Sequence, residues 1–141
     1  ALYEDFFVEG DIKFEDRVSD GINCAAISVK GELAAAAGRV VMLWNLKTKK
    51  EIKLQRFKWK KGFARHLHFT PDGKTLIASG NETNLIHRWD VATGKRLSDL
   101  VANRGGVTGM VISDDGRFLV TTGNDHAIRR FRLRARKQLS R

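Results

Sequence analysis

Histidine and serine are the first side chains to consider for chemistry, because imidazole can act as a base or bind a metal. His66 and His68 are two residues apart, so on a strand they share one face, which is how a metal site begins. No cysteine or acid follows them at ligand spacing, and the alternative is an ordinary strand face. No serine stands in a nucleophile-elbow pattern, and Gly105-Gly106 matches neither a phosphate loop nor a dinucleotide fingerprint. We therefore expect a protein that is not an enzyme and that uses no metal or cofactor.

A second kind of chemistry is suggested by residues 57–63, where aromatic residues alternate with lysines. Aromatic faces stack on bases or on arginine, and lysines meet phosphate or carboxylate, so this segment is a candidate contact surface. The alternative is that Trp59 and Phe63 fill the gap between neighbouring structural units while the lysines are merely solvated. The candidate contact residues are Lys58, Trp59, Lys60 and Lys61.

The charge is large and unevenly distributed. The net charge of +10 over 141 residues predicts an acidic partner, which could be a protein face, RNA or an anionic lipid. Residues 1–20 hold seven acids against Lys13 and Arg17, whereas residues 129–141 hold seven basic residues and no acid. We expect a basic tail over 134–141, with Arg134, Arg136 and Lys137 as contact candidates; a merely solubilising tail is the alternative.

Composition places the chain among compact soluble proteins. Apolar residues make up 42% and charged residues 30%, and the length suits one domain. No apolar run approaches the roughly 20 residues of a membrane helix, and the start lacks the basic residues of a signal peptide. We therefore expect an intracellular protein, cytoplasmic or nuclear, in which Cys24 is a small buried residue.

A repeat must position all of these residues. Gly31, Gly73 and Gly116 each separate two apolar segments, and Trp44, Trp89 and Phe131 follow them at spacings of 45 and 42 residues. The apolar segments are short and bounded by glycine, asparagine or aspartate, which predicts antiparallel strands joined by hairpins. The expected strands cover 22–29, 33–37, 40–46 and 51–57 in the first unit, 64–70, 75–79, 85–91 and 96–101 in the second, and 107–113, 118–122 and 127–133 in the third. The segment 33–37 is the least strand-like, because its four alanines favour helix.

The second unit resembles the WD-repeat family. It reads Phe69-Thr70-Pro71-Asp72-Gly73-Lys74, then Ile77-Ala78-Ser79-Gly80, then Ile86-His87-Arg88-Trp89-Asp90-Val91-Ala92-Thr93-Gly94, and the other two units follow this pattern in part. The resemblance covers about residues 21–133. It implies an all-β fold of about three four-stranded antiparallel β-propeller blades that hold protein partners together.

The resemblance also implies a buried hydrogen-bond set in each blade. The residues that fit the family's structural positions are Trp44, Ser79, Trp89, Asp90, Thr122, Asp125 and Phe131. Thr83 stands at the aspartate place of the second blade. Lys60 and Asn103 fall near the place of the expected histidine, and Arg88 and Arg130 replace an apolar residue. These arginines either reach solvent on packed stems or meet acids of a neighbour.

Three blades cannot close a ring, since propellers typically have about 4 to 8. The resemblance implies a clasp in which an N-terminal strand within residues 1–20 completes the last blade. Its acids Asp11, Glu15 and Asp16 would then meet Arg129, Arg130 and Arg132. We expect another chain to complete the ring, either a second copy or a different protein; the sequence could also be a slice of a longer propeller. The predicted function is a non-enzymatic protein-interaction scaffold, with RNA or other nucleic-acid association as the alternative.

Overall fold

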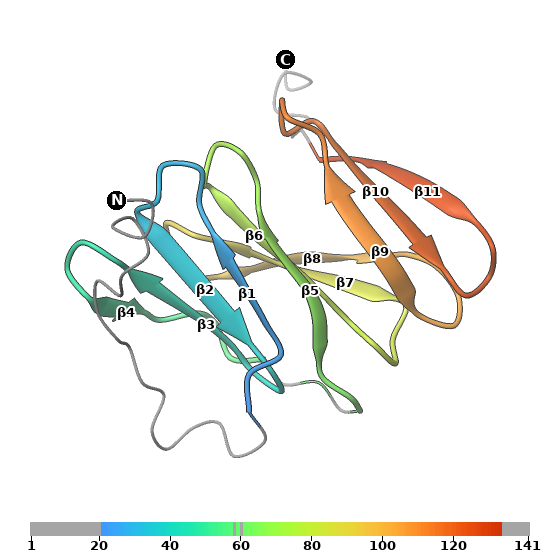
Figure 1. Cartoon of the computed structure of the whole chain (residues 1–141), viewed down its shortest axis with the longest axis horizontal. Helices are drawn as coiled ribbons and strands as arrows, with labels where there is room; N and C mark the ends of the chain where they lie inside the picture. Colours follow the sequence, from blue (N-terminus) through green and yellow to red (C-terminus); the bar gives the residue numbers. More distant parts are fainter. Residues whose placement is uncertain (1–20, 58, 60, 134–141) are drawn as a thin grey trace, which may run out of the picture.

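The computed structural model describes residues 21–57, 59 and 61–133, and this part of the chain is built from strands alone. It contains no helix long and apolar enough to cross a membrane. The strands form three antiparallel sheets in chain order, as the repeat predicts (Figure 1). The all-β prediction is therefore confirmed, and each sheet corresponds to one sequence unit.

Each sheet takes its strands from consecutive segments. The first sheet contains β1 (Cys24–Ile27), β2 (Leu33–Ala37), β3 (Val41–Asn45) and β4 (Lys50–Ile52). The second contains β5 (Ala64–Phe69), β6 (Thr75–Gly80), β7 (Leu85–Asp90) and β8 (Arg96–Val101). Within the described residues the third has β9 (Val107–Ile112), β10 (Phe118–Gly123) and β11 (Ile128–Arg132).

The hairpin turns repeat the same local chemistry. In the second sheet Asp72 accepts hydrogen bonds from the Thr70 hydroxyl and the Lys74 amide, at 2.7 and 2.9 Å. In the third, Asp115 accepts the same pair of bonds from Ser113 and Arg117, at 2.7 and 3.0 Å. Such local acceptors fix tight turns. The turn composition seen in the sequence therefore marks where each first strand reverses.

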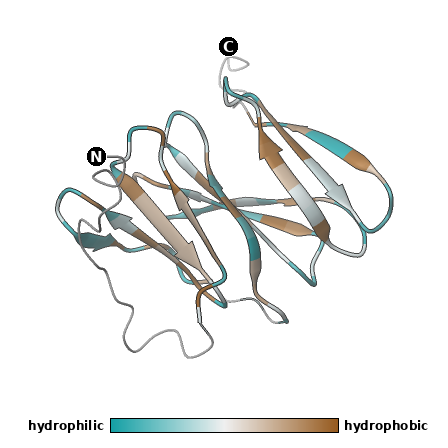
Figure 2. Cartoon of the chain, in the orientation of Figure 1, coloured by the Kyte–Doolittle hydropathy of each residue, from teal (hydrophilic) through white to brown (hydrophobic). Residues whose placement is uncertain are grey.

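Two segments depart from simple propensity. The alanine run does form β2, which pairs with both β1 and β3, because small side chains let the sheets approach closely. The strand expected over 51–57 is shorter than predicted, since β4 ends at Ile52. Figure 2 shows β2 apolar along its length and β4 hydrophilic. The chain leaves the first sheet after Ile52 to make its next hydrogen bonds with the second.

The core lies between the sheets, and the second sheet is buried on both faces. On one face Leu76 and Trp89 pack with Leu43 of the first sheet. On the other, Ile77 and Ile86 pack with Leu119 of the third. Because side chains alternate along a strand, neighbouring residues such as Leu76 and Ile77 serve opposite interfaces.

The sheets follow one another without closing. The first strands of the sheets are neighbours, β1 beside β5 and β5 beside β9 (Figure 1). Ala36, Met42 and Trp44 alternate onto the face of the first sheet that is turned away from the second, and they too are buried. This arrangement of twisted sheets side by side is that of propeller blades.

The buried face of the second sheet yields the first prediction. Leu76→Ala removes a fully buried side chain between two sheets, so we expect the free energy of unfolding to fall by about 2–5 kcal/mol. The measurement is chemical denaturation. Val101→Ala, at a position 64% exposed, is the control and should change stability by less than about 0.5 kcal/mol. Equal effects of the two substitutions would contradict the assignment of this core.

Candidate functional site

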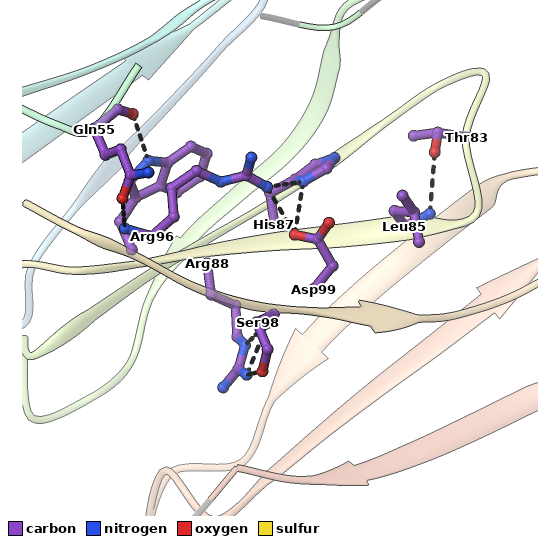
Figure 3. Close-up of polar contacts among 9 residues, drawn as sticks. Gln55, Thr83, Leu85, His87, Arg88, Arg96, Ser98 and Asp99 are labelled. Atoms are coloured by element: carbon purple, nitrogen blue, oxygen red, sulfur yellow. Dashed lines mark hydrogen bonds and ion pairs between the residues drawn. The ribbon is translucent and has the colours of Figure 1, made fainter. Parts of the chain in front are cut away.

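The segment that leaves the first sheet is fastened to the second by three hydrogen bonds around Gln55. The Trp89 indole N–H donates to the Gln55 carbonyl at 3.2 Å, and the Gln55 amide donates to the Gly94 carbonyl at 2.6 Å. The Gln55 side-chain oxygen accepts from the Arg96 amide at 2.8 Å (Figure 3). The tryptophan of the second repeat unit thus has a definite structural role. It anchors the connection between two blades.

Just beyond Gln55, the Arg96 guanidinium lies against aromatic rings. It stands 4.5 Å from the centre of the Phe57 ring and 5.8 Å from that of Trp89. Its Nη2 donates to His87 Nδ1 and to Asp99 Oδ1, both at 2.7 Å (Figure 3). A cation stacked on a ring and paired with a carboxylate is held in one position.

The same contact sets the state of His87. Arginine only donates, so His87 Nδ1 must accept and the imidazole proton lies on Nε2. Burial lowers the pKa of His87, the Asp99 carboxylate raises it and Arg96 lowers it, with burial the strongest of these influences. His87 is therefore neutral near pH 7. Its Nδ1 and Asp99 Oδ1 are 3.1 Å apart because both accept from one Arg96 nitrogen.

These residues line a cleft of about 400 Å³ between the connecting segment and the second sheet. Phe57 and Trp59 form one wall, with their rings meeting edge to face at 4.8 Å between centroids. Glu82, Thr83 and Leu85, at the start of β7, also line the cleft. Lys61 and Glu82, both exposed, lie at its rim. No feature of the sequence pattern had indicated His87, Arg96 and Asp99 as a group, because their association depends on the connecting segment crossing over β7 and β8.

Trp59 itself lies in the core rather than on the surface. It is 3% exposed, and a side chain at Gly80 would overlap its indole nitrogen. The expectation that its ring faces a partner therefore needs correction: the ring packs between sheets, as the alternative interpretation held. Phe63 is 37% exposed, and Lys58 and Lys60 lie outside the described residues.

The buried polar residues of the third sheet form a network centred on Asn103. Asn103 Oδ1 accepts from the Thr121 hydroxyl at 2.7 Å. Its Nδ2 donates to Asp125 Oδ1 at 3.0 Å and to the Ala127 carbonyl at 2.7 Å. Asp125 and Asn103, both singled out from the sequence, thus meet in one hydrogen-bond network. Thr122 was predicted to share this network, but strand alternation turns it to the other face, where its hydroxyl meets Thr108 at 3.0 Å.

In the second sheet, Ser79 finds a different partner. Its hydroxyl lies 2.8 Å from His66 Nδ1, so a strand histidine replaces the absent loop histidine. Burial lowers the pKa of His66 and of His68, which both face the third sheet. Ser79 is fully buried and His66 has no carboxylate partner among the described residues, so the pair lacks the geometry of a catalytic serine. The described residues also contain no group of three potential metal ligands.

The remaining structural candidates lie in hairpins and interfaces. Asp90 Oδ2 accepts from the Thr93 amide and hydroxyl at 3.0 and 2.8 Å, which shapes the turn before β8. Phe131 packs against the core between the second and third sheets. Arg88 was expected either to reach solvent or to meet an acid; its guanidinium instead donates to the Ser98 carbonyl on the adjacent strand, at 2.8 Å.

The arginines predicted to meet a clasp lie on β11. Arg130 and Arg132 stand 4.7 and 5.4 Å from the centre of the Phe118 ring, on the face turned away from the second sheet. Arg129 faces the other way and pairs with Asp125 at 3.5 Å. Their expected partners Asp11, Glu15 and Asp16 lie outside the described residues, as do Arg134, Arg136 and Lys137. The clasp and the tail contact stay predictions.

The Asn103 network yields a second prediction. Asn103→Ala leaves the buried Thr121 hydroxyl without its acceptor, which costs about 1–3 kcal/mol of stability by denaturation. The hydrogen bond from Asn103 is also the main cause that lowers the Asp125 pKa, so that pKa should rise towards its ordinary value when followed by NMR.

The control is Asn84→Ala, which removes an amide with no side-chain hydrogen bond to the described residues. Asn84→Ala should change neither the free energy of unfolding nor the pKa of Asp125. The pKa of Asp125 is lower in the folded protein than in the unfolded chain. The ionised Asp125 carboxylate therefore stabilises the fold fully at pH values above its unfolded-state pKa. This stabilisation is lost as the pH falls through its folded-state pKa. An Asp125 pKa that stays low in Asn103→Ala would exclude this network as its cause.

The comparison with known families bears on the repeat directly. A sequence model described as WD domain, G-beta repeat matches residues 94–131. This stretch spans β8 of the second sheet and continues to Phe131 in β11 of the third, so the sequence repeat runs across two neighbouring sheets. The first two sheets repeat the same strand order and antiparallel topology with four strands each. Residues 94–131 therefore match a WD repeat, and the three antiparallel sheets are consistent with blades of that family.

Proposed function

We propose that the chain is a non-enzymatic scaffold that binds a protein partner at the cleft between the connecting segment and the second sheet. Repeats of the WD type chiefly serve protein interactions, and the family match supports that general role here. The observation that carries the more specific proposal is the cleft, because it joins aromatic walls to a fixed arginine at one rim of the second sheet. Protein interfaces are enriched in aromatic residues and arginine at their centres.

The basic segment beside the cleft supports a partner with an acidic surface. Lys61 lies at the rim, and Lys58 and Lys60 are its neighbours in sequence. Opposite charge speeds association and selects among partners. The net charge of +10 acts in the same direction over a longer range.

Nucleic acid is the second candidate, favoured by the same charge and by the basic residues of 47–61 and 129–141. The two candidates differ in how binding responds to salt. Phosphate neutralisation makes the logarithm of affinity fall linearly with the logarithm of salt concentration, whereas an interface with an apolar centre responds much less.

The third prediction separates these candidates. The tagged chain should capture a protein from cell extract equally well with and without nuclease, and the purified partner should bind it again. A salt titration of that complex should show a shallow slope. Loss of the partner on nuclease treatment, with a steep salt dependence, would support the nucleic-acid alternative instead.

The fourth prediction concerns the basic segment. Lys58→Glu combined with Lys60→Glu should abolish binding of the captured partner and leave the thermal transition nearly unchanged, since lysine substitutions outside a packed core typically alter stability by about 0.5 kcal/mol. The matched control is Lys74→Glu with Lys95→Glu, two exposed lysines in the turns at the opposite end of the second sheet. Full binding by the folded 58/60 variant would remove this segment from the interface.

A further inference from the structure

The cleft is lined by hydrogen-bond donors that have no acceptor among the described residues. Arg96 uses one terminal nitrogen on His87 and Asp99, and its Nε–H is buried without an acceptor. A buried donor left in this way costs about 1–3 kcal/mol, which a ligand supplying an acceptor would recover.

Two further donors line the same cleft. Because His87 Nδ1 accepts from Arg96, its Nε2 carries a proton that has no acceptor among the described residues. Figure 3 shows this second nitrogen turned away from Arg96, towards the side of Thr83. The Thr83 oxygen accepts from the Leu85 amide at 3.1 Å, which leaves its hydroxyl proton free to donate.

The charges in the cleft argue against a cationic ligand. The position over the Phe57 ring, where a ligand cation would stack, is already filled by the Arg96 guanidinium. That guanidinium also neutralises Asp99 at 2.7 Å. A cation entering the cleft therefore meets a fixed positive group, while the exposed rim carries one charge of each sign, on Lys61 and Glu82.

We propose that this cleft is a recognition site for a carboxylate side chain of an extended acidic segment in a protein partner. The carboxylate accepts from Arg96, His87 and Thr83, and its methylene stem lies against the wall of the cleft that Phe57 forms. The volume of about 400 Å³ exceeds that of one side chain, so residues flanking the acid are held as well. The proposal rests on the scaffold function above and names the chemistry of the partner at that site.

The test uses the full chain and a fluorescein-labelled peptide of alternating glycine and glutamate, followed by fluorescence anisotropy. The neutral twin alternates glycine and glutamine. The glutamate peptide should bind saturably and its twin should not. Arg96→Gln should weaken glutamate-peptide binding about tenfold or more, because a hydrogen bond to a charged group is lost. Arg65→Gln removes the same charge at an exposed position of β5 outside the cleft and should weaken binding less than about twofold.

A second measurement needs no variant of Arg96, which could fail to fold. In the wild-type protein, NMR titration with the glutamate peptide should move the indole N–H signal of Trp59 and leave that of Trp44, on the far face of the first sheet, in place. Assignment of the two signals by Trp→Phe substitution completes the experiment.

Several outcomes would overturn the proposal. Equal weakening by Arg96→Gln and Arg65→Gln would show attraction by overall charge alone, and equal binding of both peptides would remove the carboxylate from recognition. Glutarate binding as tightly as the peptide would indicate a small-molecule site, and Arg96-dependent preference for an oligouridine would indicate nucleic acid. If Arg96→Gln leaves the nuclease-resistant complex with the captured partner intact, the scaffold function stands and the carboxylate site does not.

Discussion

Burial of both faces of the second sheet is the constraint on which the rest of this structure depends. A twisted sheet with an exposed apolar face is unstable in water, and here alternate residues of β6 send Leu76 to one neighbouring sheet and Ile77 to the other. Two cores of side chains therefore hold three sheets in order. Each sheet depends on its neighbour, so stability is distributed along the array rather than gathered in one centre.

The connection between sheets turns this packing into a site. Because the chain must pass from the outer strand of the first sheet to the inner strand of the second, Gln55 and Phe57 lie against β7 and β8. Trp89 fixes this crossing through the Gln55 carbonyl, and the crossing in turn brings Phe57 over Arg96. The cleft is thus a by-product of blade connectivity.

In the second and third sheets, residues other than the expected loop histidine make the buried side-chain hydrogen bonds. Asn103 satisfies Thr121 and Asp125 without an imidazole, and His66 satisfies Ser79 from a strand instead of a loop. What these positions require is that each buried donor and acceptor find a partner, since an unpaired one costs more than the net gain of the bond. The identity of the residue is secondary to the geometry of its polar atoms.

The sequence by itself determined the periodic features. Turn residues such as Asp72 and Asp115 act on their own neighbours, and alternation along a strand depends only on the backbone, so the strands, hairpins and number of units could be predicted. Tertiary structure decided what depends on the next sheet. Strand alternation and the position of Asn103 made Thr121, rather than Thr122, the buried partner, and the crossing segment ended β4 at Ile52 and buried Trp59. It also gathered Phe57, His87, Arg96 and Asp99, which lie on separate segments with no shared spacing, because contacts between sheets are set by the relative placement of whole blades.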